Sequence, residues 1–118
     1  MSANPHRLPR FSPLQEQDLD TVSCIETSIY EFPWTIGNFR DSLRAGYSCW
    51  GCRVGHDLVG YAVLMVAAGE AHLLNISVAT SWQGRGLGQV FLSFLADLAR
   101  ERHCERMLLE VQIGRAHV

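Results

Sequence analysis

The stretch Leu74-Asn-Ile-Ser-Val-Ala-Thr-Ser-Trp-Gln-Gly-Arg-Gly-Leu-Gly88 governs the architecture of this chain, because three kinds of local structure follow one another within it. Its first five residues are strand-like, its glycines mark a tight turn, and a long amphipathic helix follows. The first N–H groups of a helix have no intrahelical partner and attract an anion. We therefore predict a strand, a turn and a helix whose N-terminus fits a pyrophosphate. On the glycines alone, a merely tight connection is an equal alternative.

The residues after this turn have the apolar spacing of a single long helix. Steps of three and one separate Leu87, Val90, Phe91, Phe94, Leu95 and Leu98. We expect a helix over 86–103 that buries this face. A strand over 107–111 then returns to the sheet.

Three strand-like runs precede the quoted stretch or overlap it, at 47–54, 58–67 and 71–79. The breaks between them are short and polar, so they predict an antiparallel meander. A short edge strand is expected over 7–12, between prolines.

Two helices are expected between the edge strand and the meander. Apolar residues at helical spacing, from Leu14 to Ile29, predict the first, and Pro33 forces it to end by Phe32. Thr35 is placed to cap the second. The elements together predict an α/β (α+β) fold, with a mixed central sheet flanked by helices.

Composition limits the function classes. With 118 residues, 47% hydrophobic and 19% charged, the chain fits one folded domain. A net charge of −2 favours neither nucleic acid nor membrane as a partner, and no apolar run reaches the ~20 residues of a membrane span. All ten basic residues are Arg, which excludes a Lys-based mechanism. The absence of an export signal and the four cysteines favour a cytoplasmic protein with free thiols.

The order of residues around the glycine turn points to a family. Gln83-x-x-Gly86-x-Gly88, after a strand and before an amphipathic helix, resembles the acyl-CoA-binding motif of the Gcn5-related N-acetyltransferase (GNAT) superfamily. Three more segments, over 31–34, 70–78 and 109–111, resemble the RimI-type ribosomal-protein alanine N-acetyltransferases. The resemblance implies the GNAT fold. It also implies transfer of acetyl from acetyl-CoA to the N-terminal α-amine of a protein, an N-terminal Ala of a small-subunit ribosomal protein.

The resemblance also implies where acetyl-CoA, as substrate, binds. In such enzymes the fourth and fifth strands splay apart, and the pantetheine arm inserts between them as a pseudo-strand. A continuous strand ladder is the alternative, and Arg85 either reaches a phosphate or is a solvated turn residue. The implied binding residues are Ile76, Ser77, Val78, Gly84, Arg85, Gly86, Leu87, Gly88 and Gln89.

Glu110 stands among apolar residues of the last predicted strand, so it is either a solvated residue or a functional one. The resemblance makes it the general base that takes a proton, through water, from the α-ammonium of the acceptor. Phe32 and Trp34 are implied to line the acceptor groove, although an aromatic residue beside Pro33 is as often part of the core.

Cysteine and histidine residues do not predict a metal site. Cys49 and Cys52 form a Cys-x-x-Cys pair, but in a strand two positions three apart point to opposite faces. No second cysteine pair and no two histidines have ligand spacing. His72 and His103 are expected to be surface residues.

The C-terminal segment departs from the family pattern. The family continues with a helix that carries a Tyr acid and with two more strands, whereas here residues 112–118 follow and none is Tyr. Residues 113–118 match the translation of a sequencing adapter. We therefore expect an N-terminal tail over 1–6, an incomplete N-acetyltransferase domain over 7–111 and a non-native tail over 112–118. The alternatives are a non-catalytic CoA-binding or vestigial module, or an acetyltransferase for Lys side chains or small amines.

Overall fold

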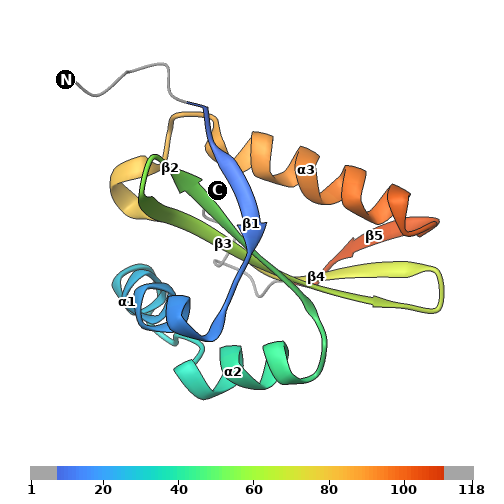
Figure 1. Ribbon diagram of the computed structural model, residues 1–118, viewed down its shortest axis with the longest axis horizontal. Helices are drawn as coiled ribbons and strands as arrows, with labels where there is room; N and C mark the ends of the chain where they lie inside the picture. The colour runs from blue at the N-terminus through green and yellow to red at the C-terminus, as the bar shows by residue number, and fades with distance from the viewer. Residues whose placement is uncertain (1–7, 111–118) are drawn as a thin grey trace.

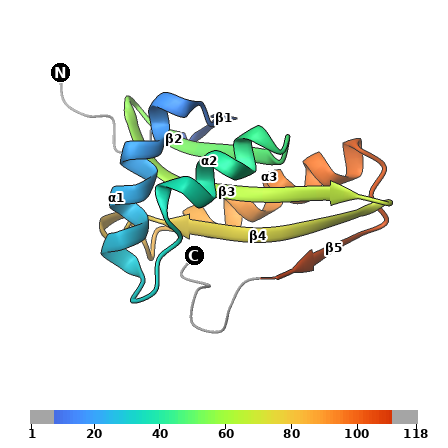
Figure 2. The same ribbon diagram turned by 90° about the horizontal axis from the view of Figure 1, so that it is seen from below.

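The computed structural model describes residues 8–110, which form one five-stranded sheet with helices on both faces (Figure 1). The strands lie in the order β1-β2-β3-β4-β5. Their bounds are β1 Arg10–Pro13, β2 Ser48–Val54, β3 Asp57–Ala67, β4 Glu70–Val78 and β5 Arg106–Leu109. The helices are η1 Glu16–Asp18, α1 Leu19–Ile29, α2 Ile36–Arg44, η2 Thr80–Trp82 and α3 Leu87–Glu101. Helix α3 covers one face of the sheet, and α1 and α2 cover the other (Figures 1 and 2).

The sheet has mixed pairing. Strands β1 to β4 pair antiparallel with their neighbours, which confirms the predicted meander, whereas β5 pairs parallel with β4 after the chain has crossed over through α3. The predicted α/β (α+β) class, a mixed sheet flanked by helices, is therefore confirmed. The predicted tails at 1–6 and 112–118, together with Arg7 and Val111, lie outside the described residues.

The α1–α2 layer begins later in the chain than its apolar spacing predicts. Leu14 is buried in the same core as Leu19, but its N–H donates to the carbonyl of Cys49 (2.9 Å) and so extends the β1–β2 pairing. The prediction that Leu14 belongs to the helix was wrong. The predicted cap of α2 is confirmed, because the Thr35 hydroxyl accepts from the Asn38 N–H (3.1 Å).

Helix α3 buries a narrower stripe than predicted. Phe91, Leu95 and Ala99 are fully or almost fully buried against the sheet, but Val90 is 47% exposed. Including Val90 in the buried face was therefore wrong. Phe11 of β1 stacks on Phe91, with ring centroids 5.2 Å apart, and this contact joins the helix to the far edge of the sheet.

The Cys-x-x-Cys pair is divided between the two cores. Cys52 packs in the core under α3 and Cys49 in the core under α1 and α2, which confirms the predicted opposite faces. Burial raises the pKa of each thiol to about 11. Both thiols are therefore protonated near neutral pH, unlike a reactive redox pair.

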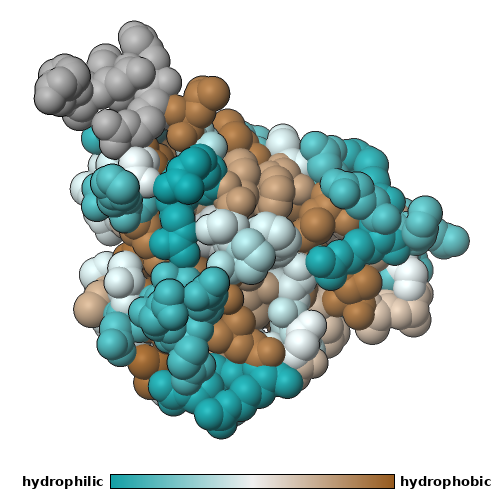
Figure 3. All heavy atoms as spheres, in the orientation of Figure 1, coloured by the Kyte–Doolittle hydropathy of each residue, from teal (hydrophilic) through white to brown (hydrophobic). Residues whose placement is uncertain are grey.

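The face of the molecule seen in Figure 3 is largely hydrophilic over the helical layers, with hydrophobic residues interspersed. Among the described helices, none combines the length and the apolar character needed to cross a bilayer.

Replacing Phe91 by Ala should lower the free energy of unfolding by about 3–5 kcal/mol, because it removes a fully buried ring together with its stacking contact to Phe11. The neighbouring Val90→Ala change is the matched control, since Val90 is half-exposed, and it should cost less than about 1 kcal/mol. Urea unfolding measures both. Equal losses for the two variants would contradict this packing of α3.

Thiol labelling at pH 8 should separate the cysteines by burial. Cys24 is exposed and should react with iodoacetamide quickly, whereas Cys49 and Cys52, with pKa values near 11, should resist labelling in the folded chain and react after denaturation. Peptide mass spectrometry assigns the labelled sites. Rapid labelling of Cys49 or Cys52 without denaturant would contradict their burial.

Candidate functional site

Strand β5 pairs along its whole length with β4, but it covers only Glu70–Leu73 of the longer strand. Pairing joins Glu70–Leu73 of β4 to Arg106–Leu109 of β5, and the last bond runs from the Glu110 N–H to the Leu73 carbonyl (2.9 Å). The described part of the chain places no strand against the same edge of β4 over 74–78. Within residues 8–110, the edge of β4 beyond Leu73 therefore has no partner strand.

The register of β3 and β4 determines which backbone groups face this open edge. Ala79 N–H donates to the Val59 carbonyl (2.8 Å), and the pairing continues with Gly60 opposite Val78. Because residues of an antiparallel ladder alternate between bonded and non-bonded pairs, Ile76 and Val78 direct their N–H and C=O groups away from β3. Two of the three predicted strand residues thus present backbone groups to the open edge.

Ser77 is placed differently from its two neighbours. Its backbone faces β3 in the same alternation, and its hydroxyl lies 2.6 Å from the Tyr30 hydroxyl and donates to Asn75 Oδ1 (2.9 Å). Any contact of Ser77 with a ligand stays a prediction.

A sharp turn carries the chain from β4 to the N-terminus of α3. Gly84 and Gly86 have φ of +79° and +82°, a left-handed backbone that other residues adopt at a cost. A Cβ at either position would meet no atom within 4 Å, so backbone conformation rather than crowding requires glycine here.

The α3 N-terminus is open to a ligand. The first intrahelical bond of α3 joins the Val90 N–H to the Gly86 carbonyl (3.2 Å), and no side chain of residues 8–110 caps the helix. The N–H groups of Leu87, Gly88 and Gln89 therefore project from the helix end with no acidic residue in the first turn. Such an end favours an anion through both hydrogen bonds and the helix dipole.

Two side chains fix the turn itself. Gln83 Nε2 donates to the Val78 carbonyl (2.9 Å), which ties the turn back to the end of β4. The Arg85 guanidinium lies over the Trp82 indole, 4.7 Å from the ring centroid. Arg85 is thus held beside the helix end, and contact with a phosphate stays a prediction.

Glu110 directly follows β5, where it makes the last described backbone bond to β4, and its side chain is 47% exposed. One carboxylate oxygen lies 3.0 Å from His72 Nδ1, and His72 Nε2 lies 3.3 Å from Glu70 Oε1. His72 was expected at the surface, and this was wrong: its side chain is only 16% exposed because it stands inside β4 between two carboxylates. The sequence did not pair His72 with Glu110, since the pairing requires the parallel register of β4 and β5.

The two predicted acceptor-side aromatics differ in exposure. Phe32 is 78% exposed in the connection between α1 and α2, while Trp34 packs against Phe39, with ring centroids 5.2 Å apart. The connection lies beside the C-terminal end of β4 (Figure 2), to which the Tyr30–Ser77 contact ties it.

A buried carboxylate that the sequence analysis missed links this connection to the sheet. Glu26 of α1 has no exposed surface. Its carboxylate accepts from the Trp34 N–H (2.8 Å), the Tyr61 hydroxyl (2.7 Å) and the Asn75 amide (3.2 Å). The position of Glu26 one residue after Ile25 on a largely apolar helix face was the available signal.

The environment of Glu26 also affects Tyr61. Burial, reinforced by the negative charge of Glu26, raises the pKa of the Tyr61 phenol well above its usual range. Tyr61 therefore stays protonated near neutral pH and donates a hydrogen bond to Glu26.

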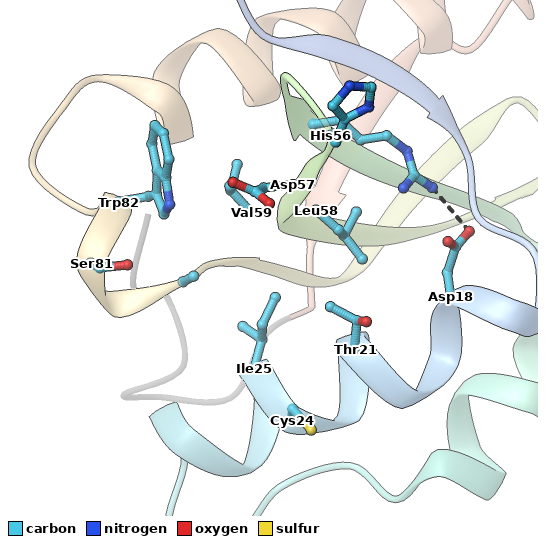
Figure 4. Close-up of a pocket in the computed structure, with 12 residues that line it drawn as sticks. Asp18, Thr21, Cys24, Ile25, His56, Asp57, Leu58, Val59, Ser81 and Trp82 are labelled. Atoms are coloured by element: carbon cyan, nitrogen blue, oxygen red, sulfur yellow. Dashed lines mark hydrogen bonds and ion pairs between the residues drawn. The ribbon is translucent and has the colours of Figure 1, made fainter. Parts of the chain in front are cut away.

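A separate cavity of about 570 Å³ lies between α1, the β2–β3 turn and η2 (Figure 4). Trp82 and Ser81 border it on one side, and Asp18 and Thr21 on the other. None of the predicted site residues lines it, so we place the candidate site at the β4 edge, where open backbone groups and the helix end converge.

Within residues 8–110, no three His, Cys, Asp or Glu side chains are grouped so that they could hold a metal ion.

Replacing Glu26 by Ala should lower the free energy of unfolding by about 2–4 kcal/mol, because two buried donors and one partly buried donor lose their acceptor. Glu16→Ala is the control, since the Glu16 side chain is 58% exposed and its pair with Arg40 contributes less than about 1 kcal/mol. Chemical denaturation measures both. A Glu26 variant as stable as the Glu16 variant would contradict the buried network.

Known proteins share this sequence and architecture. The acetyltransferase (GNAT) family matches residues 18–117. The [ribosomal protein bS18]-alanine N-acetyltransferase of Escherichia coli K12 is 30% identical over 106 residues, which are 90% of this chain and 72% of that protein. A Bacillus subtilis relative is 29% identical over 101 residues, 83% of this chain and 66% of that one.

Structure comparison agrees with the sequence comparison. The crystal structure of the ribosomal-protein-S18-alanine N-acetyltransferase from Escherichia coli superposes with a TM-score of 0.81 at 27% identity, over 86% of this chain and 66% of that one. The chain thus spans about two thirds of the length of the proteins that it matches. The resemblance inferred from the motifs is confirmed, and the chain belongs to the acetyltransferase (GNAT) family.

Proposed function

We propose that this chain binds acetyl-CoA at the open edge of β4 and transfers the acetyl group to the N-terminal α-amine of a protein. The proposed acceptor is an N-terminal Ala of a small-subunit ribosomal protein, and it rests on the similarity to the bS18-alanine N-acetyltransferases. The proposed setting is the cytoplasm.

The observation that carries the proposal is the continuity of the open β4 edge with the uncapped end of α3. Ile76 and Val78 offer strand-like hydrogen bonds to the pantetheine arm, as a peptide would receive them from a sheet edge. The turn and first helical residues, 84–89, offer N–H groups to the pyrophosphate. Acetyl-CoA, an elongated thioester in which a pyrophosphate follows the pantetheine arm, fits this order of groups.

The same strand supplies the electrostatic part of the reaction. An N–H of Ile76 or Val78, directed at the thioester carbonyl, stabilises the negative charge that develops on its oxygen during attack. Gly60 helps to fix the direction of these groups, because a Cβ there would lie only 2.8 Å from the Ser77 carbonyl and would push β3 and β4 apart.

Glu110 is the proposed general base. The acceptor arrives largely as an ammonium, and Glu110 takes one proton from it through a water molecule, which leaves a neutral amine to attack. The carbon–nitrogen bond then forms and the carbon–sulfur bond breaks, so that CoA leaves as a thiolate. The nitrogen loses its second proton as the amide forms, and this proton balances the charge of the departing thiolate. An α-amine loses its proton near ~8 and a Lys side chain near ~10.4, so a carboxylate base suits the α-amine better.

On the acceptor side, we propose that Phe32 and Trp34 line the groove for the peptide. Phe32 supplies exposed apolar surface, while Glu26 holds the backbone at Trp34. The proposed groove then lies on the α1–α2 side of the sheet, the side on which Glu26 meets β4.

Glu110→Gln should lower kcat about 100-fold and leave the KM for acetyl-CoA within about twofold, because the change removes the base but none of the groups proposed to bind the cosubstrate. Acetylation of an Ala-starting, Lys-free peptide, followed by mass spectrometry, measures turnover. Glu105→Gln is the control, since Glu105 is an exposed residue just before β5.

Calorimetric titration with acetyl-CoA separates binding from catalysis. Turnover by the unmodified chain together with loss in Glu110→Gln supports the proposal. Binding without turnover would instead favour a non-catalytic CoA-binding module, and turnover unaffected by Glu110→Gln would remove Glu110 from the mechanism.

A further inference from the structure

We propose that His72 is the proton acceptor of Glu110, and that it passes the proton on in the direction of Glu70. The inference rests on the proposed function, because it presupposes that Glu110 removes a proton from the acceptor amine.

The geometry places one imidazole between two carboxylates. Nδ1 of His72 lies 3.0 Å from Glu110 Oε1, and Nε2 lies 3.3 Å from Glu70 Oε1. Nδ1 is shielded from solvent, and within the described residues it lacks the alignment of a hydrogen bond despite this short distance. A small rotation of the Glu110 carboxylate completes the bond, so a proton on Glu110 has a nitrogen within reach.

The backbone holds these three side chains in a row. His72 lies opposite Leu108 in the parallel β4–β5 ladder, and side chains two apart along a strand share a face. Glu70 and His72 therefore lie on one face of β4, beside Glu110 two residues after Leu108. The strands thus fix the relative positions of the three side chains, because Glu70 and His72 lie in β4 and Glu110 directly follows β5.

The charged groups around His72 are a carboxylate on each side and a guanidinium behind one of them. Glu70 divides its oxygens, with Oε1 toward His72 and Oε2 toward the Arg106 guanidinium at 2.8 Å. On the β3 side the residue opposite His72 is Met65, which carries no charge. Among described residues, the charged groups in line are thus Glu110, Glu70 and, behind Glu70, the exposed Arg106.

Glu110 and His72 together can accept the protons that leave the acceptor nitrogen. Forming an amide from an ammonium removes two protons from nitrogen, and one carboxylate holds only one of them. A neutral His72 accepts at Nδ1 the proton that Glu110 has taken, and its Nε2–H faces Glu70, from which solvent receives a proton. Glu110 is thereby returned to the carboxylate form. His72 acts only through Glu110, so it is a positioning and proton-accepting residue.

The test measures acetylation of the Ala-starting peptide by the full chain from pH 6.5 to 9. His72→Gln should lower kcat about 10-fold or more near pH 7 and leave the KM for acetyl-CoA unchanged. The deficit should shrink at pH 9, where the peptide α-amine arrives already neutral. His56→Gln is the matched control, because His56 is an exposed histidine on the β2–β3 turn.

A second variant separates proton transfer from a merely structural role. Added imidazole should restore part of the turnover of His72→Ala, and the same ionic strength of sodium chloride should not. A deficit equal at every pH with no rescue by imidazole, or a His72→Gln variant as active as the unmodified chain, would overturn the role of His72 and leave the proposed function standing. An unmodified chain without turnover would contradict both.

Discussion

Strand β4 has more backbone hydrogen-bonding capacity than the sheet uses, and the candidate site depends on this surplus. Its bonds to β3 extend along the strand, whereas its described pairing with β5 ends at Leu73. The Val78 carbonyl accepts from Gln83, and within the described residues no strand covers the rest of this edge. Since backbone N–H and C=O groups in a buried strand need partners, this stretch suits an extended ligand. The helix end next to it adds N–H groups that need an anion.

The other side of β4 carries polar groups that are satisfied within the fold. Tyr61 of β3 and Asn75 of β4 donate to Glu26 of α1, and the same carboxylate accepts from the backbone N–H of Trp34. Ser77 in turn donates to Asn75. A buried carboxylate is costly unless several donors face it, so this network fixes α1, the α1–α2 connection and β4 relative to one another. One strand therefore connects the proposed acceptor side to the proposed acetyl-CoA side.

Local sequence patterns were sufficient to predict most of the helices and strands. Alternation and short polar breaks predicted the meander, and the glycine turn before an apolar stripe predicted the strand-to-helix unit. The N-cap of α2 at Thr35 was predictable because capping involves residues only three positions apart. The errors at Leu14 and Val90 have one cause: apolar spacing identifies candidates for burial, but the partner surface decides which of them are covered, and in which conformation.

The sequence by itself determined the family, the order of the elements and the positions of the glycine turn and Glu110, because these follow from motifs and periodicities within short windows. Only the tertiary structure decided that Glu26 is buried among donors from three other segments and that His72 stands between Glu70 and Glu110. Glu26 lies 35 positions from Tyr61 and 49 from Asn75, and the pair of His72 with Glu110 spans the whole of α3. Such contacts depend on strand register and layer packing, which no local pattern specifies.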